Sequence, residues 1–251
     1  MTDALHYTKA PIAEAILDVR ATLPASVNLA DLGAAAHGIK GDYPTVSNAV
    51  VFEGQWKVGA EVGATASQKH NGFRCVSADG RQAVDLRLDG FTLSRLSPYD
   101  RWETFRDEAR RLWTIYRNAV HPLAATRAGL RYVNRLDLPP GDLKEYLRTV
   151  PEVSPDLPQE IASYLLHLAI PQPDLDGLLL INQGLVPPAQ PGLISVVLDI
   201  DVFVNREFPL KADSADESGE AALWELFEKL RVRKNEVFKA CLTSRLEEMI
   251  R

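Results

Sequence analysis

Arginine and aspartate side chains recur on one side of several strand-like segments. In residues 13–23, the apolar Ala15, Leu17 and Val19 alternate with polar neighbours, which is typical of a half-buried strand. If the apolar side of each strand lies beneath helices, the opposite face is strongly charged. Its charged residues are Glu14, Asp18, Arg20, Asp85, Arg87, Asp89, Arg127, Arg131, Arg135, Asp199 and Asp201. Because an arginine fork holds carboxylate or phosphate through two parallel hydrogen bonds, this face has the chemistry of an anion site.

We expect any ligand site to lie on this face. Its candidate residues are Asp18, Arg20, Arg87, Arg131, Arg135 and Asp199. A pseudo-twofold relation between the chain halves would bring Arg20 near Arg131 or Arg135 at the molecular centre. In an enzyme, Arg20, Arg87 and Arg131 would clamp a phosphorylated substrate, and Asp18 or Asp199 would act as the base. The alternative is a solvated face whose cross-strand Arg–Asp pairs each contribute only a few tenths of a kcal/mol.

Other arginines have structural interpretations. Arg95 and Tyr99 come shortly before the N-terminus of a predicted helix, where free backbone amides favour anions. We expect Arg95 instead to be buried and paired with a carboxylate. Arg106, Arg110 and Arg117 recur within that helix beside acidic residues, which favours a solvated helix face.

The sequence lacks the motifs of common catalytic chemistry. It has no Gly-x-x-x-x-Gly-Lys-Ser/Thr loop, no Gly-x-Gly-x-x-Gly after a strand and no Gly-x-Ser-x-Gly elbow. Its five His and two Cys have no metal-ligand spacing. We therefore predict no metal, no cofactor and no catalytic residue. Cys75 and Cys241 are expected to be small buried apolar side chains of a reduced, cytoplasmic protein.

Periodicity and turn residues divide the first half of the chain into strands, a short helix and a long helix. Asn28 or Ser26 can cap the short helix, which ends near residue 38, and Asp100 can cap the long helix from residue 101. The predicted strands are 13–23, 50–62 (as one strand or two), 73–77, 83–88 and 91–96, and residues 63–72 are predicted to form a mobile polar hairpin loop.

The second half follows the same order. Asp142 can cap a helix that runs through Leu147, residues 211–219 are polar and expected to be poorly ordered, and a long helix covers 224–250. The predicted strands are 128–138, 163–170, 178–182 and 193–204.

The two long helices open with the same string, Trp-Glu-x-Phe, at Trp102 and Trp224. We expect the aromatic side chains of Trp102, Trp113, Tyr116 and Trp224 to pack these helices on the sheet. The sequence therefore predicts an α+β fold of two pseudo-repeats, 1–122 and 123–251, in one intimate unit. Each contains a strand, a helix, three or four antiparallel strands and a long helix, and together they form one curved antiparallel sheet with helices packed on one face. This topology resembles a duplicated TATA-binding-protein-like or helix-grip unit. The resemblance does not imply DNA binding, because a fold does not determine a function.

Five local strings are similar to a sporadically distributed bacterial family of uncharacterised proteins of similar length. They lie at residues 10–15, 95–102, 129–135, 198–201 and 234–238, and the Arg-Leu-x-Pro-Tyr-x-x-Trp string that begins at Arg95 is the most specific. The family has no assigned activity to transfer. Its patchy distribution implies an accessory gene, in defence or mobile-element biology.

Composition limits the partners. The net charge of −6 argues against nucleic acid. No apolar run reaches the ~18 residues that span a bilayer, and the first ten residues carry no secretory signal.

Our leading hypothesis is a non-enzymatic cytoplasmic binding protein that uses its charged sheet face for a protein partner, a homodimer contact or an anionic ligand. The alternatives are an enzyme or sensor for a phosphorylated or nucleotide ligand and a carrier of a hydrophobic ligand.

Overall fold

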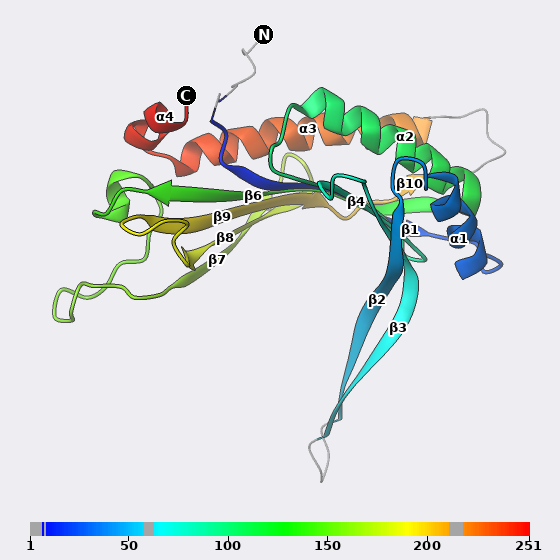
Figure 1. Ribbon diagram of the computed structural model, residues 1–251, viewed down its shortest axis with the longest axis horizontal. Helices are drawn as coiled ribbons and strands as arrows, with labels where there is room; N and C mark the ends of the chain where they lie inside the picture. Colours follow the sequence, from blue (N-terminus) through cyan, green and yellow to red (C-terminus); the bar gives the residue numbers. More distant parts are fainter. Residues whose placement is uncertain (1–6, 8, 58–62, 211–217) are drawn as a thin grey trace.

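One antiparallel sheet runs through both halves of the chain (Figure 1). The computed structural model describes residues 7, 9–57, 63–210 and 218–251, and side chains are described outside 51–68. Its strands are β1 (Ile12–Thr22), β2 (Thr45–Lys57), β3 (Gly63–Val76), β4 (Gln82–Arg87), β5 (Gly90–Leu96), β6 (Ala124–Leu138), β7 (Leu165–Gln172), β8 (Gly177–Val186), β9 (Ile194–Val204) and β10 (Phe208–Pro209). They follow the order β2-β3-β4-β5-β1-β6-β9-β8-β7, and β10 also pairs with β6.

Two long helices lie side by side along one face of this sheet (Figure 1). They are α2 (Trp102–Val120) and α3 (Ser218–Cys241). The pairs Arg106–Glu228 and Arg117–Glu220 show that the two helices run antiparallel. The shorter helices are α1 (Leu29–Gly38), which packs on α2, β3 and β4, and α4 (Ser244–Ile250), which follows α3. None of the described helices combines the length and apolar character needed to cross a bilayer.

Alternation along β1 decides which side chains face the helices. Ala15, Leu17 and Val19 are fully buried, while their neighbours are only partly buried. β1 pairs with β5 on one side and with β6 on the other, so it lies at the centre of the sheet. The first half of the chain thus continues into the second through a ladder of backbone hydrogen bonds.

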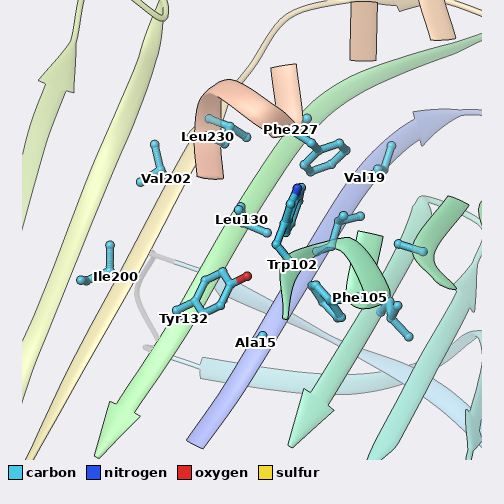
Figure 2. Close-up of a cluster of buried hydrophobic side chains, with 14 of the residues drawn as sticks. Ala15, Val19, Trp102, Phe105, Leu130, Tyr132, Ile200, Val202, Phe227 and Leu230 are labelled. Carbon is cyan, nitrogen blue, oxygen red and sulfur yellow. The ribbon is translucent and has the colours of Figure 1, made fainter. Parts of the chain in front are cut away.

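The core lies between the sheet and the two long helices (Figure 2). Trp102 and Phe105 of α2 and Phe227 and Leu230 of α3 are buried there. They meet apolar side chains of the central strands, namely Ala15, Val19, Leu130, Tyr132, Ile200 and Val202. Residues from both halves therefore share one core, in which the predicted packing roles of Trp102, Trp113, Tyr116 and Trp224 are confirmed.

The predicted α+β class and the large antiparallel sheet are confirmed. The Asn28 cap is also confirmed, because its side chain accepts from the Ala30 amide at 2.8 Å. The halves differ in the element that follows the opening strand, since α1 has ten residues whereas the second half has only a 3₁₀ turn, η1 (Leu143–Glu145). Duplication, with a boundary at residues 122 and 123, stays a prediction.

Three segments differ from their predictions. Residues 63–72 belong to strand β3, which pairs with β2 from Thr45 onward, rather than to a loop. Cross-strand hydrogen bonds form between backbones, so a polar segment of an edge hairpin needs no apolar alternation. The predicted helix over 224–250 is two helices, because Thr243 caps α4 after α3 ends at Cys241. The Asp142 cap serves only a single 3₁₀ turn. Residues 58–62 and 211–217 lie outside the described residues.

Gly90, the first residue of β5, lies very close to the backbone of β1. Its φ is 150°, and a Cβ there would lie 2.2 Å from the Val19 carbonyl oxygen. We expect Gly90→Ala to lower the free energy of unfolding by about 2 kcal/mol or more, because the central strand must move or the turn must strain. Gly41→Ala is the matched control, since nothing lies within 4 Å of its Cβ position. Urea titrations of both variants check this, and equal losses would contradict it.

Candidate functional site

The predicted site residue Asp18 is the centre of an ion-pair network on the sheet face away from the helices, here called the charged face. Its Oδ1 accepts from Arg87 Nη2 at 3.1 Å and from Thr92 Oγ1 at 2.7 Å. Its Oδ2 accepts from Arg127 Nη1 at 2.6 Å. Arg127 can cross from β6 to Asp18 because Gly129, which lies opposite Asp18, has no side chain in its path.

The network extends to both sides of Asp18. Arg87 Nε donates to Asp89 Oδ1 at 3.1 Å, and Arg20 also pairs with Asp89. Arg127 reaches Asp201 at 3.3 Å. Burial opposes ionisation of Asp89, but Arg87 and Arg20 hold its pKa below the usual value, whereas burial raises the pKa of Asp201 despite Arg127. The charges of this network therefore balance within it.

Arg131 and Asp199 form a second, separate group. Arg131 donates through Nε and Nη2 to the two oxygens of Asp199, both at 2.8 Å. The hydrogen bonds to Asp199 raise the pKa of Arg131. Asn182 donates to Asp199 at 3.0 Å and contacts His167 at 2.6 Å, so a polar ladder crosses four strands.

The structure contradicts the predicted meeting of Arg20 with Arg131 or Arg135. In the β1–β6 register, Arg20 lies opposite Arg127, while Arg131 lies opposite Ile16. Four residues of strand separate Arg127 from Arg131, or about 13 Å. Arg135 is farther still and contacts Asp137, the Pro187 carbonyl and Ser195. The antiparallel register thus divides the six predicted residues into three groups.

Each arginine named for the charged face already has an acceptor within the protein. An incoming anion would have to displace a carboxylate from a guanidinium. The charged face is therefore poorly suited to clamp a free anion, and its geometry matches the solvated, internally paired alternative more closely.

A different concavity opens on the helix side of the sheet. This cleft of about 720 Å³, here called the Lys234 cleft, lies between the segment before β1, the start of α2, strand β6 and helix α3. Its charged lining comprises Lys9, Asp100, Arg101, Glu103, Arg231 and Lys234. Aromatic side chains also line it, namely Tyr7, Tyr99, Trp102, Tyr132 and Phe238.

Lys234 is the most unusual group in this cleft. Its side chain is 9% exposed, and Nζ lies 3.7 Å from the centre of the Tyr132 ring. Among the described residues it has no hydrogen-bond acceptor and no carboxylate partner. Burial, together with the smaller effect of the neighbouring Arg231, lowers its pKa to about 7. A cationic group thus sits at the cleft wall with only an aromatic face to compensate it.

Neutral hydroxyl groups lie beside Lys234. The Tyr132 and Tyr99 hydroxyls are 2.8 Å apart and share a hydrogen bond. Burial raises the pKa of Tyr99 to about 12 and also raises that of Tyr132. Asn134 donates to the backbone carbonyls of Tyr132 and Leu198, which fixes this part of β6 against β9. Tyr132 in Figure 2 points its oxygen toward Trp102 at the start of α2.

The first turn of α2 also lines the cleft. Arg101 occupies the N-cap position without a side-chain cap, and the first helical bond runs from the Phe105 amide to the Arg101 carbonyl at 3.2 Å. The predicted cap, Asp100, accepts from the Thr104 hydroxyl instead. The amides of Trp102, Glu103 and Thr104 therefore have no acceptor within the described part of the chain. Free amides at the positive end of a helix attract anions.

Sequence reasoning did not single out Lys234, yet two signals mark it. It interrupts an otherwise apolar stripe of α3 formed by Phe227, Leu230, Phe238 and Cys241. Four of the five family-like strings also contribute residues to the cleft, namely 10–15, 95–102, 129–135 and 234–238. The fifth, 198–201, supplies the Leu198 carbonyl that accepts from Asn134.

The remaining predictions have mixed outcomes. Arg95 forms no ion pair with a described carboxylate, and its buried Nε has no hydrogen-bond partner there. Arg106 and Arg117 join α2 to α3, and Arg110 lies over Trp224, so this helix face is an interhelical contact.

Both cysteines are buried and unpaired, as predicted, and burial raises the pKa of each thiol to about 11. No cluster of three or more His, Cys, Asp or Glu in the described residues is arranged for a metal ion.

The network around Asp18 predicts a stability loss on its removal. Asp18→Asn leaves Arg87, whose side chain is 13% exposed, without its main countercharge. We expect a loss of about 2 kcal/mol in the free energy of unfolding. Glu152→Gln is the control, because its pair with Lys144 is 80% and 55% exposed, so its loss should stay below about 0.5 kcal/mol. Matched denaturation curves measure both, and a near-zero effect at Asp18 would show that the network is only a solvated surface.

Replacement of Lys234 should raise stability, in contrast to replacement of Asp18. Its pKa falls from 10.5 to about 7 on folding, so between these values the unfolded chain binds more protons and stability rises with pH. Lys234→Met removes this cost, which is largest below pH 7 and disappears as the pH rises toward 10.5. We expect the variant to be more stable than wild type by on the order of 2–4 kcal/mol at pH 7, with the gain shrinking toward pH 10. Urea titrations at both pH values test this, and a gain independent of pH would contradict it.

Comparison with known proteins gives no match. Neither a protein-family model, nor a curated protein, nor a solved structure corresponds to this chain. The geometry of the charged face and of the Lys234 cleft must therefore carry the assignment of function.

Proposed function

We propose that this protein is a small-ligand-binding protein whose binding site is the Lys234 cleft. The observation that carries the proposal is a nearly buried lysine amine at the wall of an open cleft, without a carboxylate partner in the described residues. A buried, uncompensated ammonium is costly to a fold, and natural structures ordinarily pair such groups. A ligand in the cleft would supply the missing partner.

The size and lining of the cleft support this proposal. Its volume of about 720 Å³ falls within the range of pockets that hold metabolite-sized ligands. Aromatic walls formed by Tyr99, Trp102 and Phe238 offer apolar contact, while Arg101 and Lys234 offer polar contact. Such a combination of apolar walls and a few polar groups is typical of small-molecule sites.

The other hypotheses receive less support. A hydrophobic-ligand carrier needs space between the sheet and the long helices, but Trp102, Phe105, Phe227 and Leu230 fill that layer (Figure 2). An anion clamp on the charged face needs free arginines, but Arg87 and Arg131 are paired there. Docking of a partner protein or of a second copy on the charged face stays a prediction.

Blocking the cleft should abolish ligand binding. Asn235 lies on α3 at the cleft wall, and Asn235→Trp would fill part of the space. We expect ligands found in a thermal-shift screen of cellular metabolites to raise the melting temperature of wild type and to lose that effect in the variant, because a ligand stabilises only the state that binds it.

Val232→Trp provides the matched control, since Val232 lies on the same helix, is 55% exposed and does not line the cleft. It should preserve the ligand-induced shift. Ligands that stabilise Asn235→Trp as strongly as wild type would place the binding site elsewhere. A screen without hits, combined with purified protein that carries no small molecule in native mass spectrometry, would count against the proposal.

A further inference from the structure

We infer that the Lys234 cleft is a phosphate site: its ligand is a phosphate-bearing small molecule whose phosphate group sits between Lys234 and the first turn of α2. This inference rests on the proposed function and adds the chemical class of the ligand. Charge balance, free backbone donors and the shape of the available cation each support it.

Charge balance is the first argument. Four cationic side chains, Lys9, Arg101, Arg231 and Lys234, line the cleft beside only two carboxylates, Asp100 and Glu103. The carboxylates are engaged with arginines, because Arg231 lies 3.4 Å from Glu103 and Arg101 lies 3.9 Å from Asp100. Positive charge therefore remains at the two lysines, and an anion would neutralise it.

Backbone donors are the second argument. Trp102 and Glu103, the first two residues of the uncapped helix α2, line the cleft, and no described group accepts a hydrogen bond from their amides. Phosphate groups bind at such helix ends, because several amides converge there and the helix dipole favours negative charge. Lys234 gives independent support, because it is nine-tenths buried in the same cleft and has no hydrogen-bond acceptor or carboxylate among the described residues, only the face of the Tyr132 ring.

The kind of cation available favours phosphate over carboxylate. Carboxylates are held best by the planar fork of an arginine. In this cleft the guanidinium of Arg231 already faces Glu103 and Glu228, while Lys9 and Lys234 have no carboxylate partner among the described residues. A lysine beside helix amides is a common arrangement for phosphate. The aromatic walls would face the remainder of the ligand.

Inorganic phosphate is the first probe, because it tests the site without knowledge of the complete ligand. At matched ionic strength with sodium chloride, phosphate at about ten times its dissociation constant should raise the melting temperature of wild type by about 3 °C. Lys234→Met should lose this shift. Lys229→Met, which removes an exposed lysine of the same helix paired with Glu225, should keep it. A shift of equal size in both variants would overturn the inference.

Matched ligand pairs separate this inference from the proposed function. Calorimetry would compare AMP with adenosine, glucose 6-phosphate with glucose, and citrate as a carboxylate. We expect at least one phosphate ester to bind about tenfold or more tightly than its neutral partner, with the preference lost in Lys234→Met. If neutral or carboxylate ligands bind the cleft and a phosphate group gives no gain in affinity, the phosphate inference is wrong. The proposed binding function would still stand in that case. Absence of any binding would remove both.

The pH dependence of phosphate affinity tests whether Lys234 contacts the phosphate directly. A lysine with a purely structural role would not produce this dependence. Between pH 8 and 9 phosphate is already a dianion, and the pKa values of the facing Tyr7, Tyr99 and Tyr132 are raised above their ordinary 10.0. The other charged groups facing Lys234 are Lys9, Asp100, Arg101, Glu103 and Arg231. If phosphate binds protonated Lys234, its affinity should fall about tenfold over this pH unit. A flat profile would contradict the direct contact.

Discussion

The antiparallel pairing of β1 with β6 is the constraint on which the rest of the structure depends. It places Ala15 opposite Tyr132 and Leu17 opposite Leu130 on the helix side, and Asp18 opposite Gly129 on the charged face. Because side chains alternate with a period of two, one register sets both faces, and a slip of one residue would exchange them. The same pairing joins the two halves of the chain, so the core, the ion-pair network and the position of Tyr132 beneath Lys234 all follow from it.

The two faces of the sheet differ in how their buried or half-buried charges are compensated. On the charged face, backbone register places carboxylates beside guanidinium groups, and Asp18 serves both Arg87 and Arg127. On the helix side, Lys234 lies on the buried stripe of α3, where its neighbours are apolar or cationic. Repulsion from Arg231 and burial act in the same direction there, whereas carboxylates on the charged face offset burial. Lys234 therefore brings a buried amine without a described carboxylate partner to the cleft, although all six predicted candidates were on the charged face.

Local pattern was enough to predict much of the fold. Period-two burial in β1, the Asn28 cap and the packing of Trp102 and Trp224 depend on neighbours along the chain or on burial alone, and each was predicted correctly. The candidate site depends on distant pairs instead. Arg20 meets Asp89 and Arg127 rather than Arg131 because of strand register, and Lys234 meets Tyr132 across 102 positions of sequence only after α3 packs on β6. A single sequence carries no register, so these contacts could not be read from it.

The stripe of α3 shows why Lys234 is better explained by binding than by folding. Phe227, Leu230, Phe238 and Cys241 occupy equivalent buried positions, and each contributes apolar contact to the core. A methionine at residue 234 would fit the same pattern without a desolvation cost. The lysine instead lowers the stability of the unliganded fold below its own unfolded pKa. It lines the same cleft as Trp102 and Glu103 of α2, whose amides have no acceptor among the described residues. Groups that destabilise a fold persist where function needs them. In the site that we propose, a single anion would satisfy the amine and the amides together, so a residue that costs the free protein stability would contribute to the stability of the complex.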